Sequence, residues 1–178
     1  MQITKVVFPV AGWGTRSLPA TKNIPKEMLP IFKKPVVQYV VEEAMSAGLT
    51  DVVFINNQYK KIIEDHFDYN PSLEDTLERA GKFDILKEVR AVAEMVNIIS
   101  VRQKKQLGLG HAVLCAKEVC KSDPFAVMVG DDLMFGMHSG ISQLLEAAKS
   151  ENMAVVWVIE VPENKVNRYD IIQAEQYA

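Results

Sequence analysis

Short apolar runs rich in valine and isoleucine recur along the chain, and each predicts a β-strand. The first, Ile3 to Val10, is nearly continuous and ends in Ala11-Gly12, which indicates a strand buried on both faces and followed by a tight loop. A parallel sheet is the natural setting for such a strand. Similar runs follow at Asp51 to Ile55, Val96 to Val101, Phe125 to Val129 and Met153 to Val161.

Stretches with helical spacing separate these runs. After Pro35, apolar residues recur at helical positions as far as Met45, and Gly48 supplies a stop signal, so a helix is expected here. Strands and helices therefore alternate, which is the order of an α/β protein built on a parallel sheet. Further helices are expected over 60–67, 72–80, 85–95, 111–120 and 140–150.

The segment from Thr15 to Lys34 interrupts this alternation. It contains too many prolines for a helix interior and too many cations for a buried strand. We therefore expect a long loop over the carboxyl end of the first strand, the edge at which open α/β sheets bind their ligands. These residues therefore predict an anion-binding site near the N-terminus. The prolines are Pro19, Pro25 and Pro30, and the cations are Arg16, Lys22, Lys26, Lys33 and Lys34.

Composition and charge narrow the function classes. The 178 residues are 48% hydrophobic, enough for one full core, and the net charge of −3 predicts neither a nucleic-acid partner nor an acidic disordered tail. No apolar run approaches the roughly 18 residues of a membrane span, so a soluble, cytoplasmic protein without a membrane partner is expected. Cys115 and Cys120 are interpreted as packed, reduced thiols, and the histidines show no metal-binding spacing.

The first candidate motif is Gly12-Trp13-Gly14-Thr15-Arg16, directly after the first strand. It begins like the dinucleotide fingerprint, but Ser17 occupies the third glycine position and Pro19 prevents the helix that would follow. It is not a P-loop either, because no Gly-Lys-Ser/Thr follows. What remains is a backbone cradle in which Thr15 and Arg16 reach phosphate oxygens, with an ordinary structural turn as the alternative.

Two further motifs offer groups for a phosphate and for a base. Lys26, held on a stiff loop between Pro25 and Pro30, suits a single phosphate, although a solvated lysine beside Glu27 is the commoner fate of such a pair. Gln103 has an amide that can read the edge of a base, and Gly108 and Gly110 would let backbone approach it. The alternative is a plain helix-entry turn with His111 as a satisfied, partly buried histidine.

An acidic pair, Asp131-Asp132, ends the apolar run that begins at Phe125. Carboxylates at that edge, opposite a cationic loop, fit a site where Mg²⁺ bridges carboxylate and phosphate. The alternative is a turn, since Gly-Asp-Asp is good turn chemistry.

Together these motifs resemble the bacterial UTP–glucose-1-phosphate uridylyltransferases, also called UDP-glucose pyrophosphorylases. The Pro-Lys-Glu-Met-Leu-Pro and Gly-Leu-Gly-His-Ala strings separate the chain from the related dTDP-glucose and ADP-glucose pyrophosphorylases. The residues that carry the resemblance run in family order: Pro9 to Lys22, Ile24 to Pro30, Pro35 with Gln38-Tyr39, Glu64 to Asp68, Val101 to Gln103, Leu107 to Val113, and Gly130 to Leu133.

The resemblance implies an α/β fold with a Rossmann-like, mixed but mostly parallel sheet flanked by helices. It also implies formation of UDP-glucose and pyrophosphate from UTP and glucose 1-phosphate, with Mg²⁺ as cofactor and with in-line attack on the α-phosphorus. Arg16 and Lys26 would be the catalytic cations. The nucleotide-binding residues would be Ala11, Gly12, Gly14, Thr15, Glu27, Gln103 and Gly108, and Asp131 would bind the metal.

The chain also departs from the family pattern. Residues 56–60 read Asn-Asn-Gln-Tyr-Lys where the family has a Gly/Arg-containing segment, Ser17 replaces a bulky apolar residue, and Asp170 replaces a glycine near the sugar. Family members are longer and continue into a Glu-Lys-Pro segment and a later aspartate. Residues 1–178 are therefore expected to be the nucleotide-binding portion of one nucleotidyltransferase domain without its C-terminal sugar-binding part, with weak or no turnover.

Two alternatives stay open. The departures at 56–60 and at Asp170 are compatible with a non-catalytic nucleotide-binding or regulatory paralogue. An enzyme for a different sugar 1-phosphate is the other alternative, because the sugar-facing half cannot be read from these residues. Self-association of family members makes a homo-oligomer possible.

Overall fold

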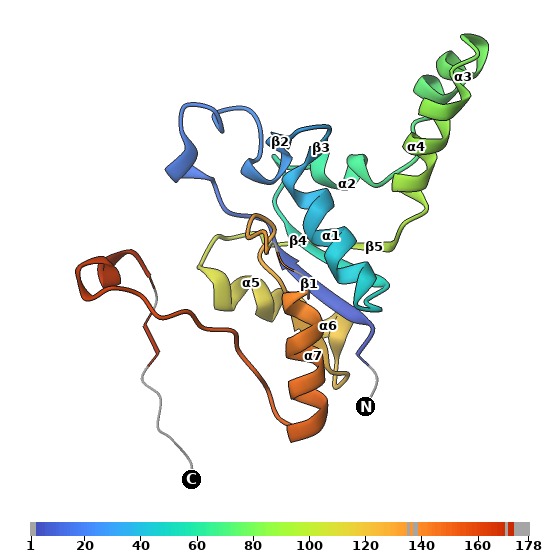
Figure 1. Ribbon diagram of the computed structural model, residues 1–178. Helices are drawn as coiled ribbons and strands as arrows, with labels where there is room; N and C mark the ends of the chain where they lie inside the picture. Colours follow the sequence, from blue (N-terminus) through green and yellow to red (C-terminus); the bar gives the residue numbers. More distant parts are fainter. Residues whose placement is uncertain (1–2, 135, 137–138, 170, 173–178) are drawn as a thin grey trace.

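A parallel β-sheet lies at the centre of the molecule, as the computed structural model shows for residues 3–134, 136, 139–169 and 171–172 (Figure 1). The strand order is β5-β4-β1-β6, and every pairing within this four-stranded sheet is parallel. The expected α/β class is thereby confirmed. The strands are β1 (Lys5–Pro9), β4 (Asp51–Asn56), β5 (Asn97–Arg102) and β6 (Phe125–Val127).

Strand β1 is buried on both faces, as its continuous apolar run predicts. It pairs with β4 from Lys5 opposite Asp51 to Pro9 opposite Ile55, and with β6 on its other side. Because side chains alternate along a strand, Phe8 packs into one apolar cluster and Val7 into the other. Both side chains are fully buried. Two core layers therefore fix the position of the strand and of the loop that follows it.

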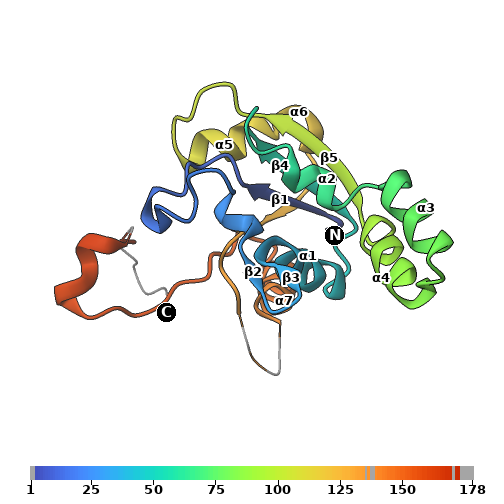
Figure 2. The same cartoon turned by 90° about the horizontal axis from the view of Figure 1, so that it is seen from above.

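Helices cover both faces of the sheet. Figure 2 shows α1 (Val36–Ser46) and α7 (Gly140–Glu151) on one side of the sheet, and α5 (Leu109–Cys115) and α6 (Lys117–Cys120) on the other. The sequence predicted one helix over 111–120, which the structure interrupts at Ala116. The remaining helices are α2 (Ile62–His66), α3 (Pro71–Arg79) and α4 (Phe83–Ala93), of which the last two form a hairpin that projects from the sheet (Figure 1).

The loop between β1 and α1 contains short regular elements. It has two 3₁₀ turns, η1 (Thr15–Ser17) and η2 (Lys26–Met28), and a small antiparallel hairpin of β2 (Pro30–Ile31) and β3 (Lys34–Pro35). The prediction of a long loop after the first strand is confirmed, and these turns give it a defined path. The cationic residues consequently have fixed positions relative to the sheet.

The prediction of a strand from Met153 to Val161 is wrong. These residues have no regular secondary structure, and Val156, Val158 and Ile159 are more than half exposed. Their composition suits a strand, but a strand also needs a neighbouring backbone to hydrogen-bond, and no strand of the described chain pairs with them. A short 3₁₀ segment, η3 (Glu163–Arg168), follows. Asp170 lies outside the described residues.

Two smaller expectations concern cysteines and membranes. Both Cys115 and Cys120 are free thiols, and Cys120 is buried. Among the described residues, no helix combines the length and the apolar character required to cross a membrane.

Candidate functional site

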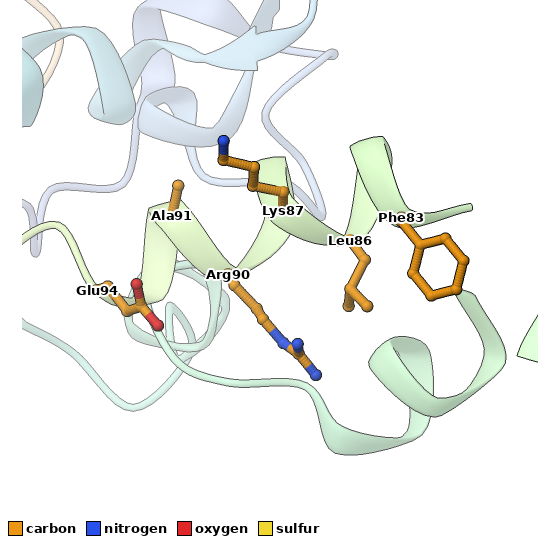
Figure 3. Close-up of a pocket in the computed structure, with 6 residues that line it drawn as sticks. All are labelled: Phe83, Leu86, Lys87, Arg90, Ala91 and Glu94. Carbon is orange, nitrogen blue, oxygen red and sulfur yellow. The ribbon is translucent and has the colours of Figure 1, made fainter. Parts of the chain in front are cut away.

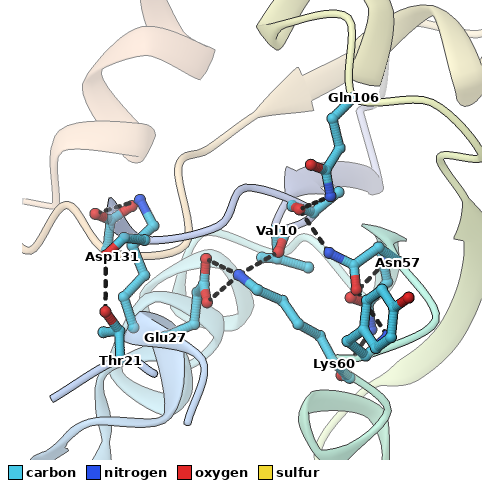
Figure 4. A network of polar contacts seen from close by, with 12 residues as sticks. Val10, Thr21, Glu27, Asn57, Lys60, Gln106 and Asp131 are labelled. Atoms are coloured by element: carbon cyan, nitrogen blue, oxygen red, sulfur yellow. Dashed lines mark hydrogen bonds and ion pairs between the residues drawn. The ribbon is translucent and has the colours of Figure 1, made fainter. Parts of the chain in front are cut away.

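The carboxyl ends of three parallel strands meet at one edge of the sheet and bring distant loops together. The loop after β4 contacts the loop after β1, where Asn57 Nδ2 donates to the carbonyl oxygen of Ala11 at 2.7 Å. The segment after β6 reaches the same place, because a Cβ built on Gly130 would lie 2.8 Å from a methyl of Val10. Figure 4 shows this network of polar contacts. It lies at the edge where α/β sheets bind ligands.

A buried ion pair joins Glu27 of η2 to Lys60, which follows β4. Lys60 Nζ donates to Glu27 Oε2 at 2.8 Å and to Oε1 at 3.1 Å, and the two side chains are 1% and 7% exposed for Glu27 and Lys60. The same nitrogen donates to the carbonyl oxygen of Val10 at 2.8 Å, so each ammonium hydrogen has an acceptor. Burial lowers the pKa of Lys60, and the Glu27 carboxylate opposes that shift.

A second ion pair, between Lys26 and Asp131, lies nearer the surface. Lys26 Nζ is 2.7 Å from Asp131 Oδ2, and the side chains are 30% and 34% exposed. These residues are 105 positions apart and meet because η2 and the segment after β6 share the sheet edge. The structure therefore places a lysine of the cationic loop next to the carboxylate of Asp131, as expected. A lysine and a carboxylate side by side can serve a ligand that carries phosphate and a divalent cation.

A glycine turn shapes the loop after β1. Gly14 is left-handed, with φ 67° and ψ 31°, and Thr21 Oγ1 donates to its carbonyl oxygen at 2.7 Å. A Cβ on Gly14 would lie 3.4 Å from that of Lys26, so the turn packs directly against the lysine. Thr15 and Arg16 follow and are exposed, and Arg16 takes part in none of the ion pairs found within the described chain.

The start of this loop is fixed by two side-chain amides. The carbonyl oxygen of Ala11 accepts from Gln106 Nε2 at 2.9 Å as well as from Asn57. Gly12 is exposed, and a Cβ placed on it would meet nothing within 4 Å, which leaves open space beside the backbone. Trp13 and Tyr59 lie next to this space with ring centroids 5.6 Å apart. The backbone at Gly12 is thus accessible to a ligand.

Gln103 lies in a neighbouring cluster. Its Nε2 is 2.9 Å from His111 Nδ1 and 3.3 Å from the carbonyl oxygen of Gly108, and the residue is buried. Gly108 has φ 94°, a conformation that favours glycine at the start of α5. His111 is therefore the partly buried, hydrogen-bonded histidine considered above. Recognition of a base edge by Gln103 stays a prediction, because its amide nitrogen already has partners within the protein.

The donor set for a metal ion is small. Within the part of the chain that the structure describes, no cluster of three or more His, Cys, Asp or Glu residues could hold a metal. Asp131 supplies one carboxylate and exposed Asp132 follows it. This set excludes an all-protein cage but suits Mg²⁺, which keeps waters and shares substrate phosphates with one or two carboxylates.

A shallow hollow of about 340 Å³ lies elsewhere, on the helical hairpin (Figure 3). Its lining comes from α4 and the residue after it, and it lacks the backbone cradle and the strand ends that define the sheet edge. We therefore do not assign the ligand site to it. The lining residues are Phe83, Leu86, Lys87, Arg90, Ala91 and Glu94.

Sequence reasoning missed four residues of the network: Thr21, Asn57, Lys60 and Gln106. The sequence indicates Lys60 only as the start of an expected helix and as part of a departure from the family pattern, yet it is the buried partner of Glu27. Nothing in the local sequence distinguishes it from exposed Lys61, because its burial depends on chain segments about 30 and 50 residues away. The turn-forming pair Asn56-Asn57 after an apolar run was the available signal.

Comparison with known proteins shows the family of this chain. Residues 5–178 match the nucleotidyl transferase family, and the chain belongs to it. Over 171 residues it is 44% identical to the UTP–glucose-1-phosphate uridylyltransferase of Bacillus subtilis (strain 168), covering 96% of this chain and 59% of that protein. The chain thus spans less than two thirds of that relative's length.

Solved structures of UDP-glucose pyrophosphorylases are also similar to this chain. The chain is similar to a UDP-glucose pyrophosphorylase from Acinetobacter baumannii, with a TM-score of 0.91 and 43% identity, covering 99% of this chain and 63% of that one. A UTP-bound form from Acinetobacter baumannii is similar with a TM-score of 0.89 and 43% identity, covering 98% and 64%. The resemblance read from the motifs is confirmed at the level of fold and relatives.

Proposed function

We propose that the chain binds UTP at the carboxyl edge of its sheet and takes part in nucleotidyl transfer from UTP to glucose 1-phosphate, with UDP-glucose and pyrophosphate as products. The observation that carries the proposal is the Lys26–Asp131 pair beside the turn at Gly14. It supplies a cation and a carboxylate at one place, and the turn is close in sequence to the accessible backbone of Gly12. Similarity to a UTP-bound pyrophosphorylase supports uridine as the base.

The proposed chemistry requires positioning and charge neutralisation. An oxygen of the sugar phosphate attacks the α-phosphorus of UTP in line, the bond to the β-phosphate oxygen breaks, and pyrophosphate leaves with that electron pair. Lys26 and Arg16 neutralise phosphate charge, and the fixed loop orients the triphosphate. In this proposal Ala11, Gly12, Gln103 and Gly108 surround the uridine, Gly14, Thr15, Arg16 and Lys26 face the triphosphate, and Asp131 holds Mg²⁺. Glu27, expected from the resemblance to bind the nucleotide, has a side chain that is 1% exposed and paired with Lys60, so here it supports the loop and does not contact the base.

The carboxylate of Asp131 fits Mg²⁺ in donor chemistry. Bound there, Mg²⁺ would neutralise phosphate charge as the leaving group departs. The existing ion pair keeps Lys26 and Asp131 at the site; with Mg²⁺ held by Asp131, Lys26 would be free to pair with a phosphate oxygen.

Calorimetric titration with UTP in the presence of Mg²⁺ tests the nucleotide half of the proposal. We expect saturable binding of UTP and at least tenfold weaker binding of ATP, because one well-placed pair of base-edge hydrogen bonds gives about 1–3 kcal/mol of discrimination. Absence of UTP binding, or equal binding of both nucleotides, would overturn it.

Pyrophosphate release after addition of glucose 1-phosphate tests the transfer reaction. It is measured on these residues joined to the C-terminal part that the longer relatives have, because residues 1–178 alone are expected to show weak or no turnover. Turnover with glucose 1-phosphate but not with galactose 1-phosphate would support the named reaction, and the reverse preference would support a different sugar. UTP binding without pyrophosphate release from either sugar would instead support a nucleotide-binding module.

A further inference from the structure

We infer that Lys60 is a positioning residue, whose buried pair with Glu27 sets the place of Lys26 beside Asp131; this inference rests on the proposed function. Lys60 is too buried to meet a ligand directly, with a side chain 7% exposed. Its effect on phosphate binding would therefore pass through another residue.

The route to Lys26 is short. Glu27 and Lys26 are consecutive residues of η2, so fixing the carboxylate of one restricts the backbone of the other. Both carboxylate oxygens of Glu27 accept from Lys60 Nζ, at 2.8 and 3.1 Å, which defines the rotation of the carboxylate as well as its place. Lys26 then meets Asp131 at 2.7 Å.

Lys60 is itself fixed by two strands. Its Nζ donates to the carbonyl oxygen of Val10, directly after β1, and its own carbonyl oxygen accepts from Asn56 Nδ2 at 2.9 Å, at the end of β4. The side chain of Glu27 also packs against the segment after β6, because a Cβ on Gly130 would lie 3.3 Å from Glu27 Cγ. Gly130 precedes Asp131. The buried pair therefore contacts the chain on both sides of the surface pair.

An apolar pair could fill the same space but could not define the same orientation. Buried ion pairs are weak contributors to stability compared with well-packed apolar residues, and fixing one arrangement is a role they can serve instead. Folding and phosphate binding should therefore respond differently to apolar substitutions of this pair. Folding should tolerate apolar residues at positions 27 and 60, whereas phosphate binding should not.

The experiment compares Lys60→Met with Lys61→Met, a control on the adjacent, 77% exposed lysine. Binding of Mg²⁺ and UTP is measured by calorimetry, and backbone hydrogen exchange is measured over η2 and β1. We expect Lys60→Met to weaken UTP binding by about tenfold to a hundredfold and to speed exchange of the Met28 and Leu29 amides by about tenfold more than that of the β1 amides. Lys61→Met should change neither by more than about twofold.

A double-mutant cycle with Lys26→Ala shows whether the effect passes through Lys26. We expect Lys60→Met to have no further effect on UTP affinity once Lys26 is alanine, because the positioned group is gone. A purely structural role would instead weaken binding equally in both backgrounds and would speed exchange in β1 as much as in η2. Either of those results would overturn the inference.

If Lys60→Met alone does not fold, the variant Glu27→Met with Lys60→Met decides the question. We expect it to fold, as judged by circular dichroism, yet to show fast exchange in η2 and weakened UTP binding. Wild-type exchange and affinity in that variant would overturn the inference. Failure of the wild-type chain to bind UTP would overturn the proposed function, while exchange in η2 would still test Lys60.

Discussion

Gly14 and Glu27 restrict the same lysine from two sides. The left-handed turn at Gly14 brings its Cα within reach of the Lys26 Cβ, while Glu27 ties the next residue to buried Lys60. The two ion pairs made by η2 consequently have different uses. The surface pair is exchangeable because water reaches it, whereas the buried pair would leave an uncompensated charge if one partner were removed.

Substitution of Gly14 by alanine should destabilise the protein. The backbone there has φ 67°, where a Cβ costs about 1 kcal/mol or more, whereas the added methyl itself would make only an ordinary contact with Lys26 at 3.4 Å. Urea denaturation should show a free energy of unfolding lower by about that amount.

The matched control is Gly110→Ala in α5. A Cβ at Gly110 meets nothing within 4 Å and φ is not left-handed, so unfolding should be unchanged or up to about 1 kcal/mol more costly. Equal stability of Gly14→Ala and the wild type would show that the left-handed turn is not required.

At the scale of elements, α1 and α2 are joined by a polar contact. His66 Nε2 at the end of α2 lies 3.0 Å from Gln38 Oε1 of α1, and its ring meets Phe67 edge-on at 5.0 Å. Gln38 in turn donates to Glu42 at 2.9 Å. A neutral imidazole that donates through Nε2 satisfies this arrangement, and burial lowers the pKa of His66.

The lowered pKa predicts a loss of stability in mild acid. As pH falls through about 6.5, the unfolded chain takes up a proton at His66 before the folded chain does, so unfolding becomes easier until the folded pKa is passed. Above that range the contribution is fully present. Urea midpoints at pH 7.5 and 5.5 should therefore differ more for the wild type than for His66→Gln. Equal differences in the two proteins would contradict this assignment.

Elements whose structure follows from their own pattern of apolar residues could be predicted from the sequence. Elements whose structure depends on contact with distant segments of the chain could not. The apolar run of β1 was sufficient because both faces of that strand are buried. The run at Met153–Val161 is also rich in valine and apolar residues, but pairing of a strand depends on its neighbour. The same distinction applies to the site. Lys26 and Asp131 were recognisable by type and spacing, whereas the role of Lys60 depends on its burial against Val10 and Glu27.

At the scale of the whole molecule, the candidate site combines segments that are 105 positions apart in the chain. Lys26 comes from the loop after β1 and Asp131 from the segment after β6, with strands β1 and β6 side by side between them. A ligand that contacts both segments should therefore stabilise the sheet as a unit, because it binds only when the strands are paired.

UTP with Mg²⁺ should raise the melting temperature. At a ligand concentration a hundred times Kd, the gain is about 2.7 kcal/mol, which corresponds to roughly 5 to 10 °C for a chain of this size. We expect EDTA to reduce this rise, and Asp131→Asn to reduce it in the same way, because both remove the metal's contribution. A rise that is equal with and without EDTA would place the nucleotide away from Asp131.

The contact between Trp13 and Tyr59 gives the molecule an internal optical probe. Trp13 is 58% exposed in the loop after β1, and its ring lies 5.6 Å from that of Tyr59 after β4. The chain has only one other tryptophan, Trp157, in the segment outside the sheet. Replacement of Trp157 by phenylalanine would leave an emitter that reports on this loop alone. Movements at the sheet edge could then be timed by stopped-flow fluorescence without any added label.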